Sequence, residues 1–139
     1  MKARVTWAEN RTFIGKSGTG HSFVFGTKEE DGTTPGPSPM ELVLIGTGGC
    51  SAYDVVSILE KGREPIEDVV VELTADRAET TPAVFTRIHM HFIVTGRGVN
   101  PAKVDRAIQL SVEKYCSASA MMAKTAEVTH DFEVVDSAA

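Results

Sequence analysis

The sequence predicts an α+β protein in which a mostly antiparallel sheet packs on one long central helix. Residues 38–63 are almost continuously apolar between a clear helix start and a clear helix stop. Segments 66–76 and 85–95 then alternate apolar and polar residues, the pattern of half-buried strands. The chain has 139 residues, so we expect a single domain over residues 1–139.

The N-terminal region predicts short strands joined by turns. Residues 3–8 and 21–25 are alternating or apolar, and residues 15–20, GKSGTG, read as a turn between them. We expect a hairpin or a small meander here. Residues 26–39 are polar and rich in Gly and Pro, which predicts a surface loop leading into the central helix.

The ends of the central helix follow capping rules. Ser38 is a good N-cap, Pro39 occupies the first helical position, and Glu41 completes an S-x-x-E capping box. At the other end, Gly62 can adopt the left-handed C-cap conformation and Pro65 prevents continuation.

The middle of this helix has no clear polar stripe, which is typical of an interior helix. Its apolar part spans roughly 14 residues, fewer than the 20 or so of a membrane span. One sheet face cannot surround such a helix, so we expect a second copy of the chain to cover the rest, giving a homodimer. Gly46, Gly48 and Gly49 precede Cys50 and each costs about 1 kcal/mol in a helix. Close approach of another backbone, or a small open space beside the sulfur, would explain them.

The second half of the chain completes the sheet and adds two helices. The strands at 66–76 and 85–95 form a long antiparallel hairpin with one polar face. Asn100 caps a helix that starts at Pro101 and ends at Tyr115. A short helix at 119–124 and a last strand at 127–135 follow.

Two histidines share the polar face of the second long strand. His89 and His91 are spaced as metal ligands can be, but Arg87 lies beside them on the same face. We therefore interpret them as part of a solvated strand surface, and we expect neither a metal nor another cofactor.

Composition narrows the partners and the location. The formal net charge is −5 and no cluster of Lys or Arg is present, so a nucleic-acid partner is not expected. The segment MKARVTW lacks the apolar core of a secretory signal. We expect a cytoplasmic protein without a membrane partner.

The chain has two cysteines, Cys50 and Cys116, without a C-x-x-C motif or the Cys/His spacing of a zinc site. A permanent disulfide is not expected in a reducing compartment. Two interpretations remain. The cysteines are either small buried apolar residues or a thiol pair with redox chemistry.

The contexts of these cysteines are similar to those of a known family. Pro39-Met40-Glu41-Leu42, the apolar helix up to Gly49-Cys50, and the pieces GGCSAYDVVSILEKGR, HFIVTGR and EKYCS resemble the OsmC/Ohr family, and most closely its YhfA-like branch. The similarity covers essentially the whole chain. It implies an α+β fold, an intertwined homodimer and the thiol-dependent reduction of organic hydroperoxides.

The resemblance also implies roles for the two thiols. Cys50 would be the peroxidatic thiolate and would become a sulfenic acid. Cys116 would then form a disulfide with it, which a dithiol reductant would reduce. This chemistry needs a thiolate near pH 7, although a free thiol has a pKa of about 8.5 and burial raises it.

In the peroxidase members an N-terminal arginine stabilises the thiolate and is held by a glutamate ten positions before the helix cysteine. In this sequence that position is Met40, and the adjacent Glu41 is also explained by its capping role. Arg11 lies in the corresponding region, where it also reads as an exposed charge at a strand end. Cys116, at the start of the short helix, is an alternative for the more acidic thiol.

Two other functions stay open. The same scaffold would serve as a non-catalytic binding protein that holds a small apolar ligand in a dimer pocket beside Cys50; Met40 favours this alternative. The cysteines would have a purely structural role if their sulfurs lie beyond disulfide reach.

Overall fold

A computed structural model describes all 139 residues, which form two compact units, Met1–Leu44 and Ile45–Ala139. The boundary between the units lies inside the central helix, α1 (Pro39–Lys61). Each unit contains one three-stranded sheet, so the single sheet expected from the sequence is wrong. The assignment of residues 1–139 to one domain stays a prediction.

The first unit contains an antiparallel meander, as predicted. Its strands are β1 (Ala3–Glu9), β2 (Thr12–Ser17) and β3 (Ser22–Gly26), paired in that order. The predicted turn at 15–20 began too early, because Gly15 lies inside β2. A Cβ on Gly15 would lie 2.7 Å from the Phe23 ring on the neighbouring strand, so this glycine makes room for an aromatic side chain rather than a turn.

The second unit follows the predicted element order, with one additional helix. After α1 come β4 (Ile66–Arg77), β5 (Phe85–Gly96), α2 (Pro101–Leu110), the π-helix η1 (Ser111–Tyr115), α3 (Ser117–Met122) and β6 (Glu127–Asp136). The strands are paired in the order β4-β5-β6; the first pair is antiparallel and the second parallel. Three of the four strand pairings in the chain are thus antiparallel.

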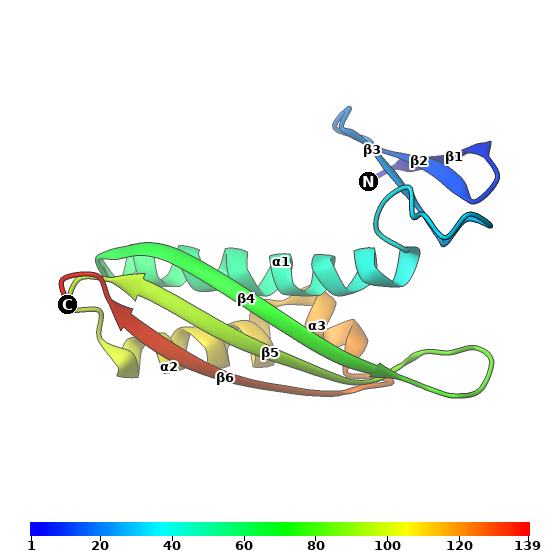
Figure 1. Ribbon diagram of the computed structural model, residues 1–139. Coiled ribbons are helices and arrows are strands. Elements are labelled where there is room, and N and C mark those ends of the chain that lie inside the picture. The colour runs from blue at the N-terminus through cyan, green and yellow to red at the C-terminus, as the bar shows by residue number, and fades with distance from the viewer. The chain divides into compact units, whose positions relative to one another are not determined.

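The core of the second unit lies between this sheet and its helices, which cover one sheet face (Figure 1). Alternate side chains of β5 point into the core and are fully buried, while His89 and His91 face the other way. This is the predicted half-buried pattern. The buried members are Ile88, Met90, Phe92 and Val94.

The capping box of α1 is confirmed, but its C-cap differs from the prediction. The N–H of Glu41 donates to Ser38 Oγ (3.2 Å), and the N–H of Ser38 donates to the Glu41 carboxylate (3.0 Å). The left-handed residue is Arg63 (φ 57°) rather than Gly62. The N–H of Arg63 bonds to Glu60 O and that of Glu64 to Leu59 O, the pair of bonds that closes a Schellman motif around Arg63.

Within the second unit, α1 buries one face and exposes another. A Cβ on Gly48 would lie 2.5 Å from Leu73 Cδ1, so this glycine lets β4 approach the helix closely. The opposite face exposes Ile45 (59%) and Tyr53 (74%), so the helix is not enclosed by its own chain. The buried face consists of Thr47, Gly48, Ser51, Val55 and Leu59.

By length and composition alone, α1 is long and apolar enough to cross a membrane. The length of the apolar stretch in the sequence therefore does not distinguish α1 from a membrane-spanning helix. The core helix of a soluble protein passes the same test. The packing of Gly48 against β4 favours the core helix.

Candidate functional site

The fold brings Cys50 and Cys116 together, although 66 positions separate them in the sequence. Cys50 lies in the middle of α1 and is half-buried, while Cys116 joins η1 to α3 and is 2% exposed. The two side chains are close enough for Cys50 to raise the pKa of the Cys116 thiol. The two thiols therefore do not lie on distant parts of the fold, which is what a purely structural role predicts.

Local backbone structure fixes the Cys116 sulfur. Cys116 is the N-cap of α3, and its Sγ accepts a hydrogen bond from the N–H of Ser119 at 3.3 Å. The thiol in turn points at the carbonyl oxygen of Thr47 on α1, 4.0 Å away. Because this residue caps the helix, α3 begins at Ser117, two residues earlier than predicted.

Burial dominates the acidity of Cys116. It raises the pKa of the thiol above the usual 9.0, hydrogen bonds from Ser119 act in the opposite direction, and the neighbouring Cys50 raises the pKa further. The idea that the start of α3 makes Cys116 an acidic thiol is thus wrong, because desolvation outweighs the capping interactions.

A buried hydroxyl cluster lies beside the two cysteines. Ser51 follows Cys50 in α1, and its Oγ is 2.9 Å from the Oγ of Ser111, the first residue of η1. Ser111 Oγ also donates to Asp54 Oδ2 at 3.0 Å. We did not predict this cluster. Asp54 is the only charged residue in the sequence between Glu41 and Glu60, and a lone charge in an apolar helix is the feature that could have indicated this cluster.

Glu41 and Arg11 belong to the first unit, whereas both cysteines belong to the second. The pKa of Glu41 is lowered by its hydrogen bonds with the backbone and then the side chain of Ser38, which fits its capping role. Within the units, the structure therefore brings together only the two cysteines among the four predicted catalytic residues.

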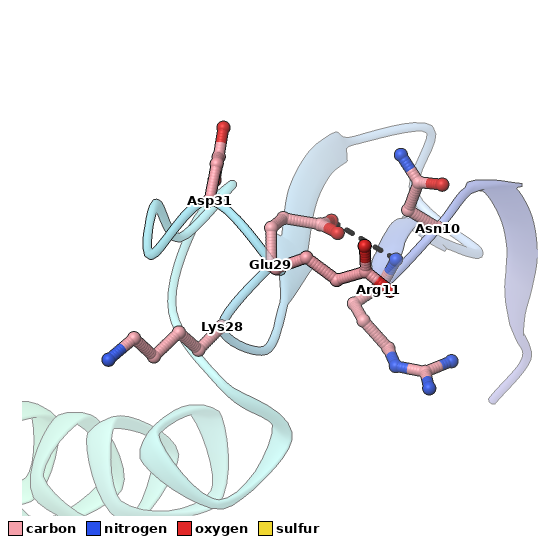
Figure 2. A pocket seen from close by; sticks show the side chains of 6 residues that line it. Asn10, Arg11, Lys28, Glu29 and Asp31 are labelled. Carbon is pink, nitrogen blue, oxygen red and sulfur yellow. Dashed lines mark hydrogen bonds between the residues drawn. The ribbon is translucent and has the colours of Figure 1, made fainter.

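Arg11 borders a polar pocket of about 670 Å³ in the first unit. Figure 2 shows the Glu29 carboxylate bonded to the backbone of Arg11, while the guanidinium is turned away from it. The N–H of Arg11 donates to Glu29 Oε1 at 3.1 Å, which ties the loop after β3 to the start of β2. Asn10, with φ 47°, makes the tight turn before Arg11.

The two strand histidines share one carboxylate on the exposed sheet face. His89 Nε2 and His91 Nδ1 lie 2.9 and 2.8 Å from the same oxygen of Asp131. This hydrogen bond raises the pKa of His91 above its usual 6.5, and the two histidines lower the pKa of Asp131. In the whole chain, no group of three or more His, Cys, Asp or Glu side chains is arranged to hold a metal ion.

Comparisons with known proteins agree with the resemblance seen in the sequence. The family model described as OsmC-like protein matches residues 30–131. The chain belongs to the OsmC-like family. Among relatives of this OsmC-like chain, protein YhfA of Escherichia coli K12 is 51% identical over 135 residues, which cover 97% of this chain and 98% of YhfA.

Solved structures show the same fold. A hypothetical protein from Aquifex aeolicus VF5 matches with a TM-score of 0.85 and 29% identity, over 97% of this chain and 96% of the other. The organic hydroperoxide resistance protein OhrB of Bacillus subtilis matches with a TM-score of 0.64 over 96% and 98% of the two chains. At 17% identity, the OhrB match establishes only the shared fold.

Proposed function

We propose that this OsmC-like protein is a thiol-dependent redox protein that reduces organic hydroperoxides with the pair Cys50 and Cys116. The observation that carries the proposal is that the fold brings the two thiols close enough for Cys50 to raise the pKa of Cys116, because disulfide chemistry requires neighbouring sulfurs. The name of OhrB concerns organic hydroperoxide resistance, but its low identity adds little weight.

The proposed cycle has three steps. The Cys50 thiolate attacks one peroxide oxygen, the O–O bond breaks, and the second oxygen leaves as an alcohol after taking up a proton. Cys50 is then a sulfenic acid, and the Cys116 sulfur attacks it, forming the S–S bond and releasing water. A dithiol reductant returns both cysteines to thiols and becomes a disulfide itself.

The half-buried and the buried thiol suit different steps. Cys50 retains the access that an incoming hydroperoxide needs. Cys116 is buried and its pKa is raised, so it stays a thiol until the sulfenic acid forms beside it. For Arg11 and Glu41 we propose only the roles that the resemblance implies, stabilising the thiolate and orienting the arginine; the Glu41 carboxylate is already bonded to Ser38.

We also propose a cytoplasmic homodimer. The face of α1 that carries Ile45 and Tyr53 is exposed, and nothing lies within 4 Å of a Cβ built on Gly46 or Gly49. Small residues next to exposed apolar ones allow a second helix to approach closely. A second copy of the chain fits this face, since most soluble oligomers are symmetric.

Consumption of cumene hydroperoxide in the presence of dithiothreitol tests the proposed activity. The wild type should turn over, Cys50→Ser should abolish turnover, and Cys116→Ser should leave one rapid reaction with peroxide but slow the return to the thiol form. A Cys50→Ser variant that consumes peroxide at the wild-type rate would overturn the proposal.

A second candidate is a binding protein without turnover. An apolar pocket of about 510 Å³ in the first unit is lined by Phe23, Phe25 and Leu42 among others, and such a pocket suits a small apolar ligand. Native mass spectrometry of the purified protein tests this alternative. A ligand that remains bound in Cys50→Ser, together with absent peroxide turnover, would favour it.

A further inference from the structure

Two buried serines connect the helical elements that carry the two cysteines. Ser51 is the residue after Cys50 in α1, and Ser111 opens η1, at whose end Cys116 lies. Both serines are 0% exposed, and their hydroxyl oxygens are 2.9 Å apart. In the dry interior, such a bond resists competition from water.

Asp54 sets the direction of these hydrogen bonds. An ionised carboxylate only accepts, so the Ser111 hydroxyl donates its proton to Asp54 Oδ2 at 3.0 Å. The lone pairs of Ser111 Oγ are then free to accept from the Ser51 hydroxyl. The result is an ordered chain from Ser51 through Ser111 to Asp54, which we call the serine clasp.

The π-helix transmits the position of Ser111 to Cys116. The N–H of Cys116 donates to the carbonyl oxygen of Ser111 at 2.7 Å, across the five residues of η1. The same residue therefore bonds to α1 through its side chain and to the Cys116 backbone through its carbonyl. π-helices are rare in proteins, and those that occur are often found at functional sites.

We propose that Ser111 is a positioning residue: held by Ser51 and Asp54, it aligns the Cys116 sulfur with that of Cys50 for disulfide formation. The inference deepens the proposed function, since it concerns the same pair of thiols. The inference does not require that the oxidant is a hydroperoxide, because any oxidant that joins the two sulfurs depends on the same alignment.

The equilibrium with glutathione measures this alignment. Oxidised glutathione gives up its S–S bond and takes two protons and two electrons to become two thiols, while Cys50 and Cys116 lose them and form one disulfide. Relative to wild type, Ser111→Ala should lower the equilibrium constant for the protein disulfide roughly tenfold, because a less constrained Cys116 has a lower effective concentration at Cys50.

Matched variants separate positioning from folding. Asp54→Ala should lower the constant like Ser111→Ala, whereas Asp54→Asn keeps an acceptor and should stay within about threefold of wild type. Ser57→Ala, at a half-buried serine of the same helix outside the clasp, should leave it unchanged. In a Cys116→Ser background, adding Ser111→Ala should not change the alkylation rate of Cys50.

The results distinguish this inference from the proposed function. If Ser111→Ala and Asp54→Ala are folded by circular dichroism and keep the wild-type constant, the clasp does not position Cys116 and the inference is overturned. If they lower it while the wild type ignores hydroperoxides, the clasp is supported and the proposed activity fails. If Ser111→Ala does not fold, the pair Asp54→Ala and Asp54→Asn gives the decision.

Discussion

The two units of the chain contain sheets of equal strand number but differ in how they bury apolar side chains. In Ile45–Ala139, helices cover one face of the sheet, and β5 alone contributes five core residues. In Met1–Leu44, only Phe25 belongs to the buried hydrophobic core, while Trp7 is 67% and Val24 48% exposed. A sheet needs a covering layer to bury its apolar face, so the first unit must obtain most of its burial from outside itself. We expect a second copy of the chain to supply it.

Phe92→Ala should have the largest effect on stability. The side chain is fully buried in the core of the second unit, and its removal leaves a cavity that costs about 3–5 kcal/mol. Denaturant unfolding measured at a fixed protein concentration gives this loss. A loss below about 1 kcal/mol would contradict the assignment of the core to this unit.

Phe23→Ala separates a monomer from a dimer. Phe23 is 46% exposed in the isolated chain, which predicts a small effect if the protein is monomeric. If a partner covers it, the dissociation free energy of the dimer should fall by about 1–3 kcal/mol. Sedimentation equilibrium of the two proteins measures the difference.

Lys2→Ala is the control, since it removes an exposed charge beside the same sheet. Its dissociation constant should match that of the wild type. A wild type that sediments as a monomer at micromolar concentration would contradict the dimer proposal.

The sequence predicted the second unit better than the first for a physical reason. In β4 and β5 one face meets the core and the other meets water, so alternation of apolar and polar residues is visible in the sequence. In the first unit every residue of β1 is exposed, so the apolar pattern of residues 3–8 does not mark a face that the unit buries. The sequence predicts a turn at Gly15, because the aromatic ring that requires a glycine there comes from another strand.

At the candidate site, the sequence and the resemblance identified both cysteines, but not what surrounds them. The bonds between Ser51 and Ser111 span 60 positions, and no local pattern encodes such a pair. The π-helix at the end of α2 was likewise invisible, because its residues continue the helical pattern. Contacts of this kind depend on tertiary packing rather than on local spacing.

Ser38→Ala and Asn100→Ala compare one type of cap in each unit. Ser38 Oγ accepts from the Glu41 N–H, and Asn100 Oδ1 accepts from the Ala102 N–H. Each loss should cost about 1 kcal/mol, because the N–H loses its partner. If the units unfold together, thermal unfolding should show one transition with similar shifts for both variants. Two separate transitions, each shifted by one variant only, would contradict a common folding unit.

Asp131→Asn should have the smallest effect, and one that depends on pH. The raised pKa of His91 means that its ion pair with Asp131 stabilises the fold below about pH 6.5 and that this contribution is lost as the pH rises through the raised value. The lowered pKa of Asp131 means that its contribution is lost as the pH falls below 3.8 through its folded-state value. The ion pair between His91 and Asp131 therefore stabilises the fold fully between the ordinary pKa of Asp131, 3.8, and that of His91, 6.5.

Unfolding midpoints at about pH 5.5 and about pH 8.5 test this window. The difference between wild type and Asp131→Asn should be clear at the lower pH and small at the higher one. Asp136→Asn, at the end of the same strand, serves as the control. An equal difference at both pH values would show that the histidines do not contribute.

The most direct test of the redox proposal is peptide mapping after one equivalent of cumene hydroperoxide. The proposal predicts an intact mass lower by two hydrogens and a single cross-linked peptide that joins Cys50 to Cys116, formed within the chain. Both thiols unchanged, or Cys50 oxidised to a sulfinic acid while Cys116 remains free, would contradict it.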